Sequence, residues 1–182
     1  MAIAADQADA SPPSTEAVFR AHGAQVSRWA RSLAGPETDV EDLTQEVFTV
    51  VHARLRSFRG DSHLSTWLFG ITANVVRRRR RIDRVRRWLG GSAQEVAGEL
   101  PAQGPGAVEA LERREARAKV YRVLEQMNER YRTAIILFEL EDVPALEVAQ
   151  LMGVKPTAIW VLLHRARADF GKRLQQLEGR EE

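Results

Sequence analysis

The chain has 182 residues, of which 44% are hydrophobic, enough to form a core in one ordinary domain or two small ones. It contains no cysteine, which excludes disulfides, thiolate metal sites and thiol redox sensing in this chain. No apolar run approaches the ~20 residues of a membrane span, and residues 1–14 lack the basic and apolar segments of a secretory signal. We therefore expect a cytoplasmic protein with no membrane insertion.

The first 88 residues carry three stretches of helical periodicity and no alternating strand pattern. The first helix is predicted over residues 15–34, with an irregular apolar face formed by Val18, Phe19, Val26, Trp29 and Leu33. The second is predicted from about Val40 to Phe58, with acidic residues in its first turn that suit the positive end of a helix dipole. After a turn at residues 59–62, the third helix has apolar residues at helical spacing: Leu64, Leu68, Ile71 and Val75.

Positive charge is concentrated at the end of this third helix. Residues 77–88 hold eight arginines and one aspartate, a net charge of +7 in a chain whose total is only +2. Clustered arginines repel one another, so a solvated helix end explains them less well than a polyanionic partner does. We therefore expect nucleic acid or another phosphate to bind here.

The composition changes after residue 88. Residues 89–106 contain five glycines, two prolines and no basic residue, which predicts a flexible linker. Helical periodicity resumes near Val108 and continues to about residue 176, and tails are expected at residues 1–14 and 177–182. The predicted fold is all-α, with two small helical domains over residues 15–88 and 107–176.

The C-terminal domain contains a helix-turn-helix pattern over residues 144–168. Ala149 is small where two short helices cross closely, and Gly153 lies in the turn. Ile159 and Leu162 direct the second helix back into a core. In such a motif the second helix commonly lies in the major groove of DNA. A plain helical hairpin in a bundle has some of the same spacing, so the pattern favours DNA binding without establishing it.

One flank of the third helix carries a mixture of side chains typical of nucleic-acid binding. At 100° per residue this flank contains Trp67, Asn74, Arg77, Arg78 and Arg81. Guanidinium groups hold phosphates, an amide bonds base edges, and an aromatic ring stacks on an unpaired base, which together suit partly melted DNA. Core packing is an equal alternative for the tryptophan, and a plain surface amide for the asparagine.

A polar patch lies on the second helix, away from its apolar stripe. It is formed by Asp42, Gln45 and Glu46. Polar helix faces are usually only solvated, so this patch is weak evidence for a partner when it is taken alone.

Two strings of the chain resemble conserved regions of one protein family. Residues 39–81, with EDLTQEVF and FRGDSHLSTWLFGITAN, resemble the second region of sigma factors of the sigma-70 family, and most resemble its extracytoplasmic-function (ECF) class. Residues 123–174, from VLEQM to GKRL, resemble the fourth region of that class. A loose linker stands in place of the third region.

The resemblance implies a protein that is not an enzyme and needs no cofactor or metal. Such a protein binds core RNA polymerase, recognises two promoter elements and helps to open the DNA. It implies that the clamp helices of the polymerase's largest subunit bind Asp42, Gln45 and Glu46. The class also implies an anti-sigma factor as a further partner.

The resemblance also assigns two DNA-contacting sets. The loop at residues 57–63 and the helix after it would read and melt the downstream (−10) element through Arg59, Ser62, His63, Trp67, Asn74, Arg77, Arg78 and Arg81. The helix at residues 157–167 would enter the major groove of the upstream (−35) element through Thr157, Trp160, Val161, His164, Arg165 and Arg167.

The predicted recognition helix departs from the class at its start. Members usually have a small residue and basic or polar groups there, whereas this chain has Ile159, Trp160 and Val161. With Ile159 in the core, Val161 and His164 face outward and Trp160 lies at the edge, so the face offers few hydrogen bonds to base edges. Upstream readout is therefore the least secure implication.

Other function classes fit the sequence less well. The four histidines are scattered without metal-ligand spacing, and there is no glycine-rich phosphate loop, which argues against an enzyme. A sigma-like regulator that binds polymerase or another protein with little promoter readout is the main alternative. An ordinary helix-turn-helix repressor is a third, although it does not need the polar patch on the second helix.

Overall fold

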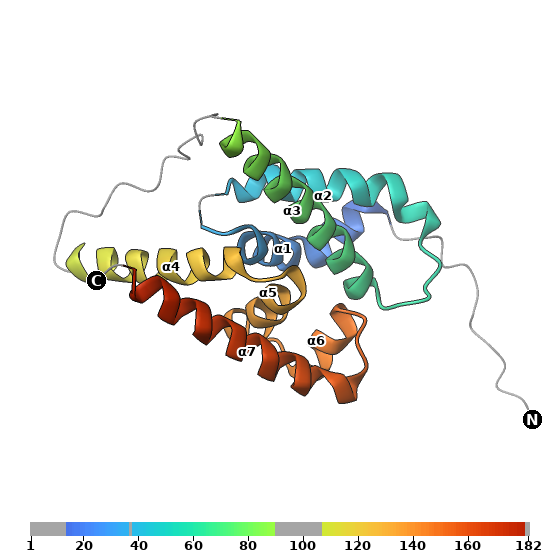
Figure 1. The fold of residues 1–182 in the computed structure, drawn as a ribbon. Helices are drawn as coiled ribbons and strands as arrows, with labels where there is room; N and C mark the ends of the chain where they lie inside the picture. Colours follow the sequence, from blue (N-terminus) through green and yellow to red (C-terminus); the bar gives the residue numbers. More distant parts are fainter. Residues whose placement is uncertain (1–13, 37, 90–106, 181–182) are drawn as a thin grey trace, which may run out of the picture.

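The computed structural model describes residues 14–36, 38–89 and 107–180, and every regular element within these ranges is a helix (Figure 1). The N-terminal elements are α1 (Thr15–Ala34), α2 (Val40–Arg54), the 3₁₀ turn η1 (Leu55–Ser57) and α3 (Leu64–Trp88). The C-terminal elements are α4 (Ala107–Gln126), α5 (Glu129–Ile135), the π-helical turn η2 (Ile136–Leu140), α6 (Ala145–Leu151) and α7 (Pro156–Glu178). The predicted all-α class is confirmed.

Short polar side chains fix where several helices begin. The Ser14 hydroxyl accepts a hydrogen bond from the backbone N–H of Ala17 at 3.1 Å, and the Asp39 carboxylate accepts from two N–H groups at the start of α2. The Asn128 side chain accepts from the N–H of Tyr131 at 2.9 Å at the start of α5. Each cap satisfies N–H groups that have no partner inside the helix.

The predicted helix bounds differ from the structure at two ends. The α-helix expected to reach Phe58 stops at Arg54, because the chain tightens into η1 and Phe58 is extended, with ψ of 115°. The last helix continues to Glu178, so it extends two residues into the stretch predicted to be a tail, which starts at residue 177. Phe19, expected on the apolar face of α1, is 54% exposed and packs edge-on against Phe48, with ring centroids 4.8 Å apart. The predicted linker and N-terminal tail lie almost wholly outside the described residues.

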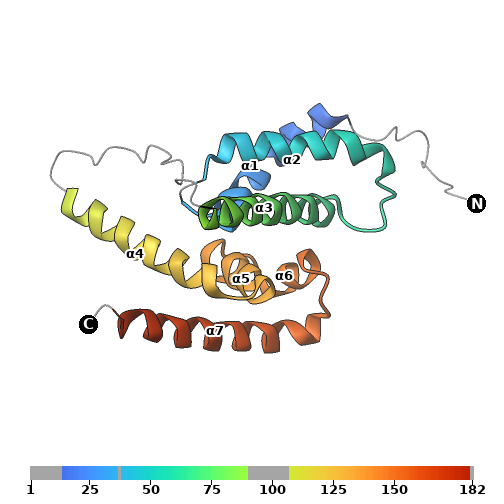
Figure 2. The ribbon, with the colours of Figure 1, turned by 45° about the horizontal axis from the view of Figure 1, so that its top comes forward.

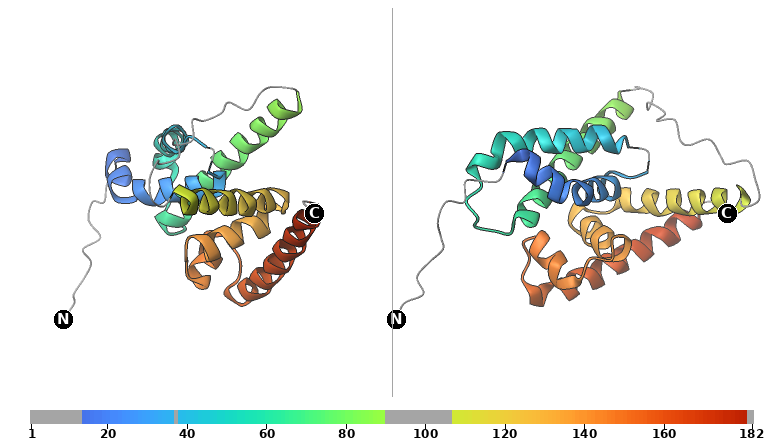
Figure 3. Two further views of the ribbon diagram at one scale, coloured as in Figure 1. Left: turned by 90° about the vertical axis from the view of Figure 1, so that its left-hand side faces the viewer. Right: turned by 180° about the vertical axis from the view of Figure 1, so that it is seen from behind.

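The helices form two layers. Figure 2 shows α1, α2 and α3 packed together on one side and α4 to α7 on the other. Within the first layer, the Trp29 ring of α1 meets the Phe69 ring of α3 edge-on at 5.2 Å. Figure 3 shows that α7 runs along the outer edge of the second layer, away from α1 to α3. Phe69, predicted to be core, is 3% exposed.

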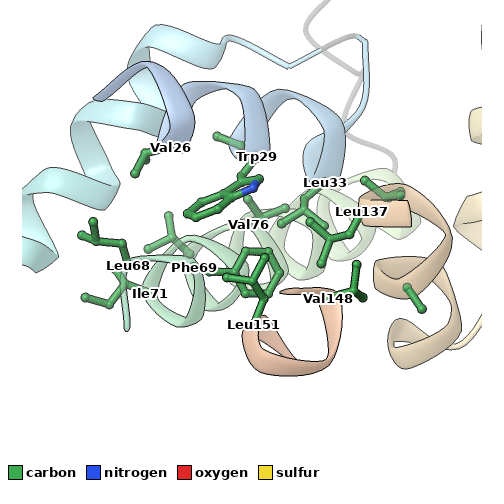
Figure 4. Packing of buried hydrophobic residues seen from close by; sticks show 14 of the residues in the cluster. Val26, Trp29, Leu33, Leu68, Phe69, Ile71, Val76, Leu137, Val148 and Leu151 are labelled. Carbon is green, nitrogen blue, oxygen red and sulfur yellow. The ribbon is translucent and has the colours of Figure 1, made fainter. Parts of the chain in front are cut away.

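The two layers share one hydrophobic core. Helix α6, the first of the helix-turn-helix pair, packs against α3, and Figure 4 shows Val148 and Leu151 facing the side of α3 that carries Phe69 and Val76. Leu33 of α1 lies beside Leu137 of η2 in the same view. The two predicted domains are therefore packed against each other, which the sequence patterns did not predict.

No single helix among the described residues is long and apolar enough to cross a membrane. Helices α6 and α7 together pass on length and composition, but they meet at a 98° bend. Most of the apolar residues of this pair belong to the shared core, which is typical of a helix-turn-helix packed in a globular domain.

Candidate nucleic-acid and protein interfaces

The arginines of α3 point in three directions. Arg77, Arg78 and Arg81 are exposed and make no ion pair with any described residue, and Asn74 is exposed beside them. Arg79 turns towards α2, and Arg80 turns towards α5. The exposed three are therefore available for phosphates, and their contact with DNA stays a prediction.

Trp67 is neither fully buried nor free. It packs partly against the core, and its ring lies 5.2 Å from the Phe58 ring at a tilt of 45°. Both rings line a hollow of about 330 Å³ whose other walls are Ser57, Arg59, Asp61 and Ser62. Arg59, Ser62 and His63 are exposed at this loop. An aromatic wall beside exposed polar and basic groups suits an unstacked base.

The polar patch of α2 has a cationic neighbour that the sequence analysis missed. Asp42 and Gln45 are exposed and Glu46 is half-buried. The Arg79 guanidinium lies 3.3 Å from Oδ2 of Asp42 and 3.8 Å from Oε2 of Glu46. The spacing of Arg79 could have revealed this contact. It follows Ile71 and Val75 at four-residue steps and so continues the buried stripe of α3 towards α2.

The helix-turn-helix pair has the expected geometry. Gly153 adopts φ of 62° in the turn, a conformation that favours glycine, and Pro156 occupies the first turn of α7. Ala149, Ile159 and Leu162 are buried, as their spacing predicted. The motif is therefore held by core packing, with the start of α7 presented outward.

The exposed face of α7 is largely apolar at its start and partly neutralised further on. Trp160 and Val161 are 58% and 52% exposed, while Thr157, His164 and Arg165 are exposed around them. Trp160 meets the Phe138 ring edge-on at 6.0 Å. Arg167 lies over the same ring at 5.2 Å, and its Nε donates to Glu139 at 2.6 Å. One of the cations predicted to contact the −35 element is thus already paired with a carboxylate.

The described residues contain no group of three or more His, Asp or Glu side chains placed to hold a metal. Among the described residues, Tyr121 has a clearly perturbed pKa. Burial raises its pKa above the ordinary value, although the nearby Arg117 guanidinium acts in the opposite direction. Its phenol stays protonated at neutral pH and donates to the backbone carbonyl of Ser32 at 3.2 Å.

Comparison with known proteins shows the family to which this chain belongs. Residues 18–87 match Sigma-70 region 2, and residues 117–170 match Sigma-70, region 4. RNA polymerase sigma factor NccH of Alcaligenes xylosoxydans xylosoxydans is 32% identical over 85% of this chain and 83% of its own. The chain belongs to the ECF class of RNA polymerase sigma factors.

Two further relatives agree with this assignment. The ECF RNA polymerase sigma-E factor of Escherichia coli K12 is 30% identical over 78% of this chain and 77% of its own. The solved structure of CnrH in complex with the cytosolic domain of CnrY is 25% identical, with a TM-score of 0.57 over 89% of this chain and 88% of CnrH. This sigma factor therefore acts in promoter-specific transcription initiation, and sigma factors are generally not enzymes.

Proposed function

We propose that this sigma factor divides its work among three surfaces. The α2 patch docks on core RNA polymerase, the α3 flank with its loop reads and melts the −10 element, and the start of α7 contacts the −35 element. The observation that carries this proposal is that α3 has the hollow lined by Phe58 and Trp67 at its start and, further along, exposed arginines that make no ion pair with any described residue. One helix thereby offers both base stacking and phosphate holding.

The −10 surface combines two kinds of contact. Arg77, Arg78 and Arg81 fix the DNA backbone, because charge-assisted bonds from guanidinium groups to phosphates are strong but carry no sequence information. Asn74 and the Trp67 hollow act on bases that leave the stack, with Arg59, Ser62 and His63 at the rim. Unpairing a base costs a few kcal/mol, and stacking of about 1–3 kcal/mol per base offsets it.

The docking surface is acidic and partly organised. Asp42, Gln45 and Glu46 share one side of α2, and Arg79 holds the two carboxylates from α3. A basic surface on the clamp helices of the polymerase's largest subunit complements this patch. Electrostatic complementarity of this kind sets orientation and association rate more than raw affinity.

The −35 surface is proposed as the weaker reader. Trp160 and Val161 present apolar surface where base-reading side chains usually stand, and Arg167 is engaged by Glu139. Phosphate contacts by His164 and Arg165 then supply most of the binding, with a smaller share from the engaged Arg167 and with Thr157 near the start of the helix.

A regulatory partner and a cellular location are also proposed for this sigma factor. CnrH was solved with the cytosolic domain of CnrY, and we propose that an anti-sigma factor likewise binds this chain. A cytoplasmic location is proposed because the chain must reach polymerase and promoter DNA.

The docking assignment is tested by reversing one charge. Glu46→Lys places like charge at the interface, which costs several kcal/mol, so the variant should stay folded but fail to co-purify with core polymerase. Glu16→Lys makes the same change at an exposed site on α1 and should bind core normally. Core binding by Glu46→Lys equal to that of Glu16→Lys would refute the assignment.

One observation favours a second function, a sigma-like regulator that reads promoters poorly. The exposed Trp160 and Val161 would suit a protein partner as well as DNA. Run-off transcription with core polymerase and a promoter library separates the two, because a regulator of this kind yields no specific transcripts while still binding core.

A further inference from the structure

The last two turns of α3 stand apart from the other helices. The left view of Figure 3 shows this end of the helix extending away from them. Ile82, Val85 and Trp88 are 38%, 48% and 83% exposed, and Arg81 and Arg84 are exposed between them. Such a helix end gains little from packing, and its arginines repel one another. These turns therefore suit a negatively charged partner.

A straight stripe of exposed residues runs along α3 to this end. Its members follow one another at alternating steps of three and four residues: Asn74, Arg77, Arg81, Arg84 and Trp88. At about 100° per residue, all five fall within an arc of about 80°. The stripe thus extends the flank proposed to bind the −10 element by two further residues, an arginine and a tryptophan.

The chemistry of the stripe fits the backbone of a nucleic acid. Arg77, Arg81 and Arg84 make no ion pair with any described residue, so their guanidinium groups are available for phosphates. The indole of Trp88 has one N–H donor and no acceptor, and its ring is a large apolar surface. Phosphate and sugar alternate along a strand, so a cation and an amphipathic ring one turn apart match that alternation.

The stripe reaches further along DNA than the −10 surface alone. The rise from Asn74 to Trp88 is about 21 Å at about 1.5 Å per residue, which equals about six base pairs of B-form DNA. The hollow at the start of α3 is proposed to take unstacked bases, so the Trp88 end lies over base pairs that stay closed. The chain leaves this end towards the C-terminal domain, which is proposed to bind the −35 element, so the Trp88 end faces upstream.

We propose that Arg84 and Trp88 bind the sugar–phosphate backbone of the duplex just upstream of the −10 element, in the spacer between the two promoter elements. Arg84 neutralises one phosphate, and Trp88 donates its indole N–H to another while its ring covers the neighbouring sugar. Contacts of this kind carry no base information, so they anchor closed duplex beside the stretch that melts, whatever the spacer sequence. The proposal rests on the proposed −10 role of α3.

Two versions of one promoter test the contact. The promoter is one from which the holoenzyme makes run-off transcripts, and the second version carries neutral methylphosphonate linkages in roughly the six base pairs upstream of the −10 element. Fluorescence anisotropy at several salt concentrations measures binding of the holoenzyme to each version.

The two substitutions should weaken binding to the natural version only. Arg84→Ala should make the slope of log affinity against log salt shallower by about 1. Arg84→Ala with Trp88→Ala should weaken binding about tenfold, as expected when hydrogen bonds to charged groups are lost. On the neutral version, both variants should bind as the unsubstituted protein does, because the phosphate charges that they would contact are absent.

Arg86→Ala is the matched control. It removes an exposed arginine of the same two turns, on the side of α3 opposite Trp88, and should change binding to neither version. Equal losses for Arg84→Ala and Arg86→Ala, or losses that persist on the neutral version, would overturn the proposal. Weaker binding of Trp88→Ala to core polymerase without DNA would also overturn it, because the indole would then belong to a protein contact.

Arg77→Ala separates this proposal from the proposed function. It lies nearer the −10 surface and should weaken binding to both versions of the promoter. A loss for Arg77→Ala with none for Arg84→Ala and Trp88→Ala would refute the spacer contact alone. No loss for Arg77→Ala on either version would refute the −10 role of the flank itself.

Discussion

The two surfaces proposed to bind DNA, on α3 and on α7, differ in how many of their cations are free of an ion pair among the described residues. On α3, Arg77, Arg78 and Arg81 are exposed and make no ion pair with the described residues. On α7, Arg167 is held by Glu139 and by the Phe138 ring, and Trp160 and Val161 take up the start of the outward face. A region that melts DNA must hold phosphates and bases strongly, whereas a tethered second module contributes through effective concentration even when it binds weakly.

The largest expected effect is a loss of promoter DNA melting when two side chains of the −10 surface are truncated. Trp67→Ala with Asn74→Ala removes a stacking wall and an amide from the −10 surface, and each stacked base is worth about 1–3 kcal/mol. Permanganate footprinting should show loss of the promoter bubble, with transcription reduced about tenfold or more. Trp160→Ala, the same truncation in region 4, should leave the bubble intact. A normal bubble in the double variant would reduce Trp67 and Asn74 to structural residues.

The second prediction compares the arginines by salt dependence. The slope of log affinity against log salt should become shallower by about 1 in each of Arg77→Ala, Arg78→Ala and Arg81→Ala, because each substitution removes one contact with a phosphate. Arg167→Ala should lower it by less than half as much, because Glu139 already neutralises that cation. Titrations of promoter DNA with holoenzyme at several salt concentrations measure both. If Arg167→Ala lowered the salt slope as much as the α3 substitutions do, the two surfaces would not differ in available charge.

The third prediction concerns bases of the upstream element. A good bidentate contact is worth about 1–3 kcal/mol, and few side chains on the outward face of α7 make one. Single base changes should mostly cost less than about 1 kcal/mol, the lower edge of that range. A base-by-base scan in a transcription assay tests this. Tenfold losses at two or more positions would establish direct readout, and no loss when the whole element is replaced would favour a protein partner for Trp160 and Val161.

The smallest effect should come from releasing Arg167. Glu139→Gln removes the carboxylate that engages it while keeping the shape of the side chain. The salt slope of DNA binding should then steepen by up to about 1, since one more cation meets phosphate. Glu147→Gln neutralises another region 4 carboxylate, on α6, and serves as the matched control. A steeper slope in the control as well would show a general charge effect instead.

Sequence reasoning predicted the helices because their apolar periodicity is local. It predicted the buried residues of α7 and the turn at Gly153 for the same reason. It did not predict that α2 ends at Arg54, since the following η1 turn also keeps Leu55 buried and so preserves the apolar pattern.

The contact between the two domains was beyond sequence reasoning for a different reason. Tyr121 and Arg132 donate to the backbone carbonyls of Ser32 and Leu33, and such acceptors leave no trace in residue type. Arg132, beside the run AIILFEL, looks like an ordinary surface cation, although the structure buries it. Arg79 and Arg80 were hidden inside a block of five arginines, and only their four-residue spacing from Val75 and Val76 distinguishes them. The DNA and polymerase roles of the candidate residues stay predictions.

The hydrophobic core shared by the two domains bears on how the chain unfolds. Residues of α1, α3, η2 and α6 pack in one cluster. Elements that bury apolar surface against each other lose that stabilisation together, so the two domains should unfold in one cooperative transition. A destabilising substitution in the core of either domain would then lower the thermal stability of both.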